Sequence, residues 1–397
     1  MKSIIRSIKI LSAALLCAIL SITSTGCGNG SGQATDITAA SELLGEAELS
    51  GQYAEFFSIK DDGGYIKELF VKNTWEEKGK VEKYILAPRD CTGILSGNLN
   101  ALPYPIKSVV CMSSSHVAYL SALGEAECIK AISGTRFIYN EDVLRLIKEE
   151  KIVDIGSETS PNYEKILALN PDLVVTYSIG ASDNSHINIL KKLGIKVLTI
   201  GDYLENSPLG KMEYIKLFGY LTDKPGLADS LFKVKCAEYI NIKEKLAASM
   251  EGTGPTPVLV NMPYKGAWYI PGERSYISQL VRDAGGVILG AKQGEHQSAQ
   301  YGFEYIYSLA LQAKVWLHPN AINTMEDLGN ENPMFKNIAP FKTGEVYNNN
   351  RRSTPEKGSD FWETGVVEPH IILQDLASIL HPEVFGAKEF KYYHKLK

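Results

Sequence analysis

The fold is decided by residues 227–250, which read LADSLFKVKCAEYINIKEKLAASM. Apolar side chains recur in this stretch at steps of three to five residues, which is the spacing of one face of an amphipathic helix. Asp223 is placed to cap the helix, Pro225 suits its first turn, and a run of glycines and prolines after residue 251 ends it. The sequence predicts one helix, about 37 Å long at about 1.5 Å per residue. The apolar face is formed by Leu227, Leu231, Val234, Tyr239, Ile242 and Leu246.

The chain looks alike on the two sides of this helix. Residues 163–177 read YEKILALNPDLVVTY, and residues 303–317 read FEYIYSLALQAKVWL. When the two stretches are aligned without a gap, Glu164 meets Glu304 and Leu169 meets Leu309. Each stretch begins with an aromatic residue and a carboxylate at a helix start and ends in an apolar run with strand character. The repeat predicts two similar α/β lobes joined by the long helix.

Strand and helix patterns alternate on both sides of the helix, which indicates a parallel sheet covered on both faces in each lobe. Residues 56–86 differ, because apolar and polar residues alternate there between turn signals, which predicts a small antiparallel meander. The predicted organisation is a signal peptide (1–27), a tether and β add-on (28–104), an N-terminal lobe (105–222), a bridging helix (223–251) and a C-terminal lobe (252–397).

Composition is that of a soluble globular protein with room for two cores: 397 residues, 44% hydrophobic and 22% charged. The formal net charge of −5 argues against nucleic acid as a partner, because binding to phosphates requires a basic surface.

The N-terminus has the features of an export signal. Lys2, Arg6 and Lys9 precede an apolar stretch, residues 10–22, that is short for a membrane span. The residues that follow, Ser24-Thr25-Gly26-Cys27, resemble a lipobox, at which bacterial lipoproteins are lipidated on cysteine. We expect a lipid on Cys27 that attaches the protein to a membrane; a soluble exported protein cut nearby is the alternative.

No pattern for catalysis or for a bare metal ion occurs in the sequence. GxGxxG, GxxxxGK[ST], HExxH and GxSxG are all absent, and the seven histidines are scattered singly. Beyond Cys27 the cysteines form no CxxC pair, and Cys111 and Cys128 lie in apolar surroundings typical of small buried hydrophobic residues. The sequence therefore predicts a binding protein without a resident cofactor or metal site, and not an enzyme.

Aromatic residues gather in the loops where ligands of parallel sheets bind, outside the carboxyl ends of the strands. Such walls suit a large, planar, partly apolar ligand. The cations available for an anionic ligand are Arg136, Arg274, Arg351 and Arg352. The predicted ligand-binding residues are Phe137, Tyr139, Tyr177, Tyr264, Trp268 and Trp362, together with His116 and His296.

Three stretches carry a resemblance to a known family: SVVCMSSSHVAYLSALG from residue 108, VDIGSETSPNYEKILALNPDLVVTY from residue 153, and LGIKVLTIGDY from residue 193. From about residue 106 to about residue 385 the chain is similar to the Fe/B12 periplasmic-binding domain. That domain is the substrate-binding component of ABC importers for ferric siderophores, haem and cobalamin. The resemblance implies two α/β lobes bridged by one long helix.

The resemblance also implies roles for individual residues. Glu164 and Glu304 match the two carboxylates that dock onto arginines of the permease in this family. Tyr177 and Tyr139 match aromatic positions of cobalamin binders, whereas the second-lobe aromatic position of some relatives is Ser298 here.

Together these expectations describe a monomeric, lipid-anchored, extracytoplasmic protein that holds a metal chelate and delivers it to an ABC permease and its ATPase. The chelate is a corrinoid (cobalamin), haem or a ferric siderophore, and neutral aromatic walls favour the corrinoid. Haem would require an axial ligand, for which Tyr139, Tyr177, Tyr264 and His296 are candidates. Two alternatives stay open: a receptor for free zinc or manganese, and a lipoprotein enzyme or adhesin that uses the same fold.

Overall fold

The computed structural model of the chain describes residues 51–72, 79–157, 159–178, 185–386 and 388–397. The predicted signal peptide and Cys27 lie outside the described residues. The described residues form one compact unit that contains both lobes. Within the described part of the chain, no helix has the length and apolar character needed to cross a membrane.

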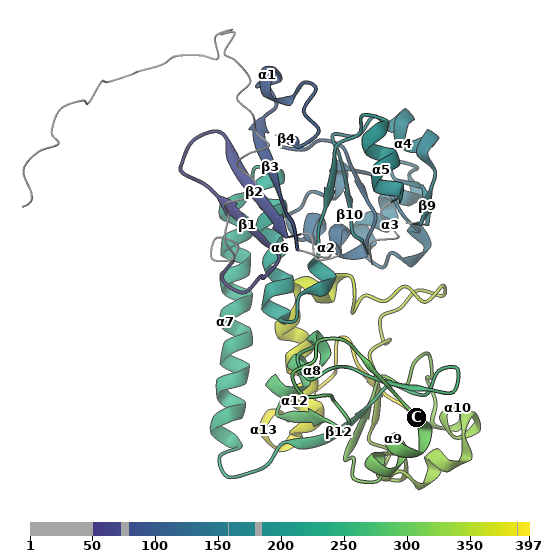
Figure 1. Ribbon diagram of the computed structural model, residues 1–397. Coiled ribbons are helices and arrows are strands. Elements are labelled where there is room, and N and C mark those ends of the chain that lie inside the picture. Colours follow the sequence, from purple (N-terminus) through teal and green to yellow (C-terminus); the bar gives the residue numbers. More distant parts are fainter. Residues whose placement is uncertain (1–50, 73–78, 158, 179–184, 387) are drawn as a thin grey trace, which may run out of the picture. The chain divides into compact units, whose positions relative to one another are not determined.

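The first lobe is built on a sheet with the strand order β11-β10-β5-β6-β7, in which all neighbours are parallel (Figure 1). The central strands β5 and β10 are buried along their whole length, which explains their continuous apolar runs. Ser113 caps α2 by accepting a hydrogen bond from the backbone N–H of Ser115. The elements of this lobe are β5 (Val109–Cys111), α2 (Ser114–Ala122), η3 (Ala126–Cys128), β6 (Ile129–Ile132), η4 (Thr135–Phe137), α3 (Glu141–Lys148), β7 (Val153–Asp154), β8 (Gly156–Ser157), β9 (Ser160–Pro161), α4 (Tyr163–Leu169), β10 (Leu173–Thr176), α5 (Ser185–Lys192), β11 (Val197–Thr199), η6 (Asp202–Leu204) and α6 (Pro208–Leu221).

The second lobe repeats this plan. Its sheet has the order β14-β12-β16-β17-β18, and only the last pair is antiparallel. The order β17-β16-β12-β14 corresponds to β11-β10-β5-β6 of the first lobe, and α9 precedes β16 as α4 precedes β10, which confirms the predicted two-lobe α/β fold. The elements are β12 (Thr256–Val260), β13 (Trp268–Ile270), α8 (Tyr276–Asp283), β14 (Gly286–Ile288), β15 (Ala299–Tyr301), α9 (Phe303–Ala310), β16 (Val315–Leu317), α10 (Met325–Glu331), η7 (Pro333–Asn337), α11 (Ala339–Thr343), β17 (Val346–Asn348), η8 (Thr364–Val367), α12 (Pro369–Leu380), α13 (Pro382–Phe385) and β18 (His394–Lys395).

An additional sheet with the order β1-β2-β3-β4 precedes the first lobe. Strands β1 to β3 form the predicted antiparallel meander. Strand β4 was not predicted, and it pairs with β3 in parallel. The elements are β1 (Phe57–Lys60), β2 (Lys67–Lys72), β3 (Val81–Pro88), α1 (Thr92–Leu95) and β4 (Ala101–Tyr104).

The long helix is α7, Pro225–Ser249, and it packs against α6 of the first lobe and α12 of the second. The predicted helix is confirmed, but two details of the prediction were wrong. Asp223 does not cap the helix: its φ is +59° and Lys224 precedes the first turn without a side-chain cap. The apolar face was only partly right: Tyr239 and Leu246 are buried, but Leu227 is 45% exposed and Val234 is 60% exposed. The buried residues are Ala228, Phe232, Cys236, Tyr239 and Leu246.

A close approach of two helices explains the shifted face. Gly219 of α6 lies against Ala228 of α7, and a Cβ added to Gly219 would come within 2.5 Å of the Ala228 Cβ. Two helix backbones can come this close only where the residues between them are small. The contact therefore places the small Ala228 between the two helices, and the neighbouring, larger Leu227 faces solvent.

Two buried carboxylates attach residues 52–56 to the first lobe. Glu213 accepts the backbone N–H groups of Gln52, Tyr53 and Ala54 at 2.7–3.0 Å. Glu205 accepts those of the next two residues at 3.0–3.2 Å. Five consecutive N–H groups are thus bound by two side chains of the first lobe, which attaches this segment firmly to it.

The buried carboxyl of Glu205 gives a pH-dependent prediction. Burial raises its pKa from 4.5 to about 8, although the N–H groups of Glu55 and Phe56 oppose this shift. The folded protein therefore holds a proton that the unfolded chain releases, so this contribution to stability is lost as the pH rises from about 5 to about 8. We expect Glu205→Gln to flatten the fall in unfolding free energy between pH 6.5 and 8, by roughly 1 kcal/mol per pH unit. Urea titrations at both pH values measure this.

Two features allow the change in pH dependence to be assigned to Glu205. The pKa values of His116 and His318 are lowered by burial to about 4, so their effect on stability falls mainly below pH 6.5. Glu127 is exposed, and Glu127→Gln serves as the matched control. An unchanged pH slope in Glu205→Gln would contradict the assignment.

Candidate functional site

A hollow of about 560 Å³ lies between the two lobes. The first lobe supplies the loop after β6 and one face of α3, and the second lobe supplies the segment after β17. Both segments follow the carboxyl ends of parallel strands, where ligands of such sheets bind. The lining residues are Thr135, Arg136, Ile138, Tyr139, Glu141, Leu144 and Ile147 from the first lobe and Ser353, Thr354, Pro355 and Glu356 from the second.

Arg352 lies beside this hollow in a fixed orientation. Its Nε donates to the carboxylate of Asp360 at 2.6 Å, and Asp360 is fully buried. The guanidinium carbon lies 4.7 Å from the centre of the Tyr139 ring, so a cation of the second lobe stacks on an aromatic ring of the first. Nη1 and Nη2 donate no hydrogen bond to any residue that the structure describes. They are therefore available to a carboxylate, which a guanidinium binds with two parallel hydrogen bonds.

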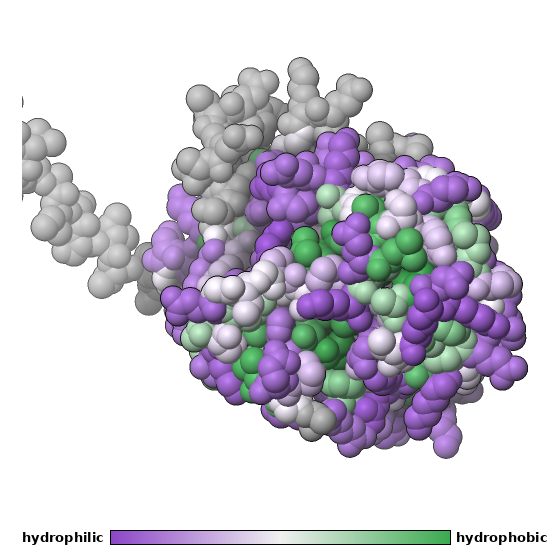
Figure 2. Space-filling model, turned by 90° about the horizontal axis from the view of Figure 1, so that it is seen from below, coloured by the Kyte–Doolittle hydropathy of each residue, from purple (hydrophilic) through white to green (hydrophobic). Residues whose placement is uncertain are grey.

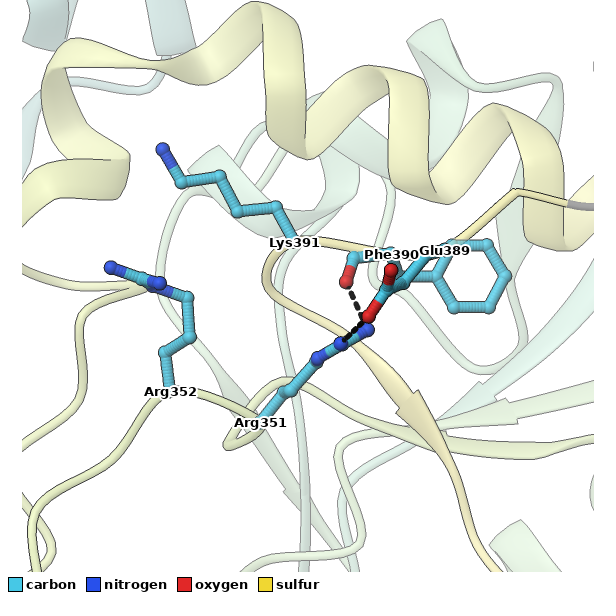
Figure 3. Close-up of a pocket in the computed structure, with 5 residues that line it drawn as sticks. All are labelled: Arg351, Arg352, Glu389, Phe390 and Lys391. Carbon is cyan, nitrogen blue, oxygen red and sulfur yellow. Dashed lines mark hydrogen bonds and ion pairs between the residues drawn. The ribbon is translucent and has the colours of Figure 1, made fainter.

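A second hollow, of about 290 Å³, lies on another side of Arg352 (Figure 3). Arg351 is directed at Glu389 and at the carbonyl of Phe390, and it donates to both. The side chains of Arg352 and Lys391 point away from that pair. Three cations and one carboxylate line this hollow, and each cation is paired with a carboxylate: Arg351 with Glu389, Arg352 with Asp360 and Lys391 with Glu368.

The two lobes are joined at this site by a buried carboxylate. Glu363 accepts the backbone N–H of Tyr139 at 2.8 Å and that of Asn140 at 2.9 Å. The side chain is fully buried, and burial raises the pKa of its carboxyl from 4.5 to about 7, with a further contribution from Asp360. The two N–H groups act in the opposite direction, because they stabilise the charged form.

Three of the predicted ligand-binding residues lie at or next to the contact between the lobes. Tyr139 lines the interlobe hollow. Phe137 precedes it in the same loop and is 39% exposed. Trp362 is 42% exposed, and its ring lies 6.0 Å from that of Tyr276 and 5.8 Å from the ammonium of Lys211 on α6.

Three others lie in different surroundings. Tyr177 follows β10, is half-buried, and meets the ring of Tyr203 edge-on at 5.8 Å. Tyr264 is 58% exposed in a turn that its backbone closes with Ala267. His296 is exposed. None of these three lines either of the hollows described above.

The last two, Trp268 and His116, are fully buried, which corrects their assignment as ligand contacts. Trp268 begins strand β13, donates from Nε1 to the carbonyl of Val260, and packs against Trp316 in the core of the second lobe. His116 lies inside the first lobe against Phe218, 6.2 Å away. Neither side chain reaches a surface that a ligand could touch.

The structure also describes the cysteines and possible metal ligands. Cys111 and Cys128 are buried and unpaired, as their apolar surroundings predicted. Among the described residues, no group of three or more His, Cys, Asp or Glu side chains is arranged to hold a metal ion.

Residues 109–350 match the model of a family described as periplasmic binding protein. The chain belongs to this family. Periplasmic binding proteins are substrate-binding proteins rather than enzymes. The match spans the whole sheet of the first lobe, the long helix, and the second lobe as far as the end of β17.

Relatives agree with this family membership. An uncharacterized lipoprotein of Methanocaldococcus jannaschii is 25% identical over 98% of this chain and 96% of its own length. An uncharacterized ABC transporter substrate-binding lipoprotein of Bacillus subtilis, YvrC, is 26% identical over 55% of this chain and 64% of its own length. Among solved structures, a periplasmic haem-binding protein of Pseudomonas aeruginosa superposes with a TM-score of 0.56 at 14% identity, over 74% of this chain and 98% of its own, which shows a shared fold.

In this periplasmic binding protein, Glu164 and Glu304 occupy equivalent places. Each is exposed in the first turn of its helix, and the helices begin at Tyr163 and Phe303, the positions that the sequence repeat aligned. Tyr305 and Leu311 are 52% and 51% exposed at the two ends of α9. Figure 2 shows apolar residues gathered among hydrophilic ones on the face seen from below.

Sequence reasoning missed the residues that join the two lobes of this periplasmic binding protein. Both carboxylates are neighbours of Trp362, which was predicted to contact the ligand, but nothing local indicates that Asp360 or Glu363 is buried. One signal was available: Arg352 and Asp360 lie close together in the sequence, in a segment rich in charged and aromatic residues. A charge buried in such a segment requires a partner of opposite charge, and these two residues could form that pair.

Proposed function

We propose that this protein is the extracytoplasmic substrate-binding lipoprotein of an ABC importer and that it captures a metal chelate between its lobes. Family membership and the name of the Bacillus subtilis relative support the transport role. The lipoprotein names of relatives and the residues before Cys27 support a lipid anchor outside the cytoplasm. The observation that carries the proposal is the hollow lined from both lobes, with Tyr139 and Arg352 stacked beside it.

Arg136 in the wall of the hollow and Arg352 beside it favour an anionic, partly aromatic chelate, although Glu141 and Glu356 also line the hollow. Its volume lies within the range of about 300–1,000 Å³ that is typical of small-molecule sites. Arg136 lines the hollow, is exposed and forms no ion pair with a described residue, and Arg352 presents its two Nη atoms beside Tyr139. These two guanidinium groups match the carboxylates of haem or of a ferric siderophore better than the neutral periphery of a corrinoid. The aromatic walls alone favoured a corrinoid, and the two arginines favour an anionic chelate instead.

Within this class, haem is the first candidate, because Tyr139 lines the hollow and tyrosine ligates ferric haem in other proteins. The solved Pseudomonas aeruginosa protein with the same fold is described as haem-binding, which is compatible with this choice.

Titration of the purified protein with haemin, a ferric carboxylate siderophore and cyanocobalamin tests the proposal. We expect quenching of tryptophan fluorescence by haemin or the siderophore, because Trp362 lies next to the contact between the lobes. Arg352→Gln should weaken an anionic chelate about 10- to 100-fold, which corresponds to a charged hydrogen bond of about 1.5–3 kcal/mol, and leave cyanocobalamin unaffected. If haem binds through Tyr139, Tyr139→Phe should change the haem absorption spectrum.

Tyr264→Phe is the matched control, since Tyr264 is an exposed tyrosine that lines neither hollow. Binding of cyanocobalamin in preference to both anionic chelates, together with an unchanged affinity in Arg352→Gln, would contradict an anionic ligand. Absence of binding by all three compounds would contradict the chelate class itself.

A further inference from the structure

The chain that leaves strand β17 returns across the first lobe before it enters α12. Residues 349–363 connect β17 to η8, and η8 packs against α2 and α6 of the first lobe. We call residues 349–367 the return segment. The lobes are therefore in contact through this segment as well as through α7.

The return segment contacts one loop of the first lobe along its length. Thr354 donates from Oγ1 to the carbonyl of Arg136 at 3.2 Å. Gly358 lies so close to Phe137 that a Cβ at this position would come within 2.1 Å of the Phe137 carbonyl oxygen. This contact requires glycine, because any larger residue would push the segment away from the loop.

Glu363 forms the most buried of these contacts. Its two carboxylate oxygens accept the N–H groups of Tyr139 and Asn140, one each. Asn140 is the N-cap of α3, and its own side chain accepts the N–H of Val143. The carboxylate of the second lobe thus binds donors at the start of a helix in the first lobe, where negative charge is stabilised.

The loop of residues 136–140 also forms part of the wall of the interlobe hollow. Tyr139 has its backbone bound by Glu363 and its ring stacked on the guanidinium of Arg352. Both partners belong to the return segment, so two separate contacts, one to the backbone and one to the ring, hold Tyr139 against the second lobe. Lys211 of α6 adds a contact farther along, with its ammonium 5.5 Å from the ring of Tyr276 and 5.8 Å from that of Trp362.

We infer that Glu363 is a positioning residue that fastens loop 136–140 of the first lobe to the second, so that Tyr139 is held in the wall of the hollow and the lobes keep a fixed separation at this edge. Opening of the hollow requires the two N–H groups of Tyr139 and Asn140 to leave the carboxylate together. Glu363 therefore limits how fast a bound molecule leaves. The last statement depends on the proposed binding function, whereas the fastening of the loop does not.

Hydrogen–deuterium exchange followed by mass spectrometry tests the fastening directly, since peptides covering residues 134–145 contain both amides. In Glu363→Ala we expect these amides to exchange at least 10-fold faster, with no change in strand β5. Glu363→Gln keeps the size of the side chain and one acceptor oxygen, so its effect should be intermediate. Glu331→Gln, an exposed glutamate at the end of α10, should behave as the unchanged protein does.

Ligand release supplies the second measurement. In Glu363→Ala and Glu363→Gln we expect faster dissociation of the chelate, by about 10-fold and by less, with a small change in the association rate. Unchanged exchange of the loop amides in Glu363→Gln would overturn the inference. This variant preserves packing, so it decides the question even if Glu363→Ala proves too unstable to measure. If no chelate binds to the unchanged protein, the proposed function fails, but the exchange measurement still decides whether Glu363 fastens the loop.

Discussion

Replacing both Glu164 and Glu304 with lysine is expected to abolish chelate uptake while leaving chelate affinity unchanged. Both carboxylates are exposed in the first turn of helices that occupy the same place in the two lobes. A permease built from two halves can meet such a pair with two arginine sites, one for each lobe, and reversal of both charges turns two attractions into two repulsions. Neither residue lines a hollow, so capture of the chelate should proceed as before.

The loss should not come from unfolding. A lysine in the first turn of a helix opposes the helix dipole at a cost of about 0.3–1 kcal/mol, which is small beside the roughly 5–15 kcal/mol that stabilises a folded domain. Uptake of radiolabelled chelate by cells that depend on this protein measures the effect. The matched control reverses two exposed glutamates elsewhere, Glu127→Lys and Glu331→Lys, one in each lobe. Normal uptake by the Glu164/Glu304 variant would refute the docking role.

Much of the fold could be predicted because the determining signals are local. Alternating strand and helix patterns predicted the parallel sheets, and the repeat of residues 163–177 at residues 303–317 predicted that α4 and α9 begin at matching positions. In each case a few neighbouring residues carry the physical cause, which is periodic burial.

Features set by distant contacts could not be predicted in this way. The buried face of α7 depends on its approach to Gly219, which hydrophobicity alone does not reveal. Glu363 binds amides 224 and 223 positions away, and no pattern around it distinguishes it from an exposed glutamate. Strand β4 pairs with β3 in parallel after a short excursion, although sequence proximity favours an antiparallel hairpin.

Trp268 shows how the assignment of aromatic residues failed. The residue was placed in a loop, but it belongs to strand β13, whose burial alternates between Trp268 (buried), Tyr269 (exposed) and Ile270 (buried). Three residues are too few for this alternation to be recognised in a sequence. As a result, the inward-facing Trp268 was assigned the role of a pocket wall, whereas Tyr269 is the residue of this strand that reaches solvent.

Trp268→Ala is expected to lower the free energy of unfolding by about 3–5 kcal/mol, because it removes a fully buried ring from the core of the second lobe. The ring packs against Phe303, Trp316 and Phe335 at centroid distances of 6.1–6.2 Å, and its Nε1–H is bound to the carbonyl of Val260, which would lose that donor. Urea unfolding followed by circular dichroism measures the change. We expect the second lobe to unfold at a lower urea concentration than the first, which can split the transition into two steps.

The matched control for this prediction is Tyr264→Ala, which removes a 58% exposed ring from the turn before the same strand. Its stability should change by less than about 0.5 kcal/mol, as at other exposed sites. In conditions where Trp268→Ala is folded, its affinity for the chelate should equal that of the unchanged protein, because the side chain has no exposed surface through which to touch a ligand. If Trp268→Ala instead bound the chelate more weakly without losing stability, Trp268 would be a ligand contact after all. The second lobe would then have to rearrange when the chelate binds.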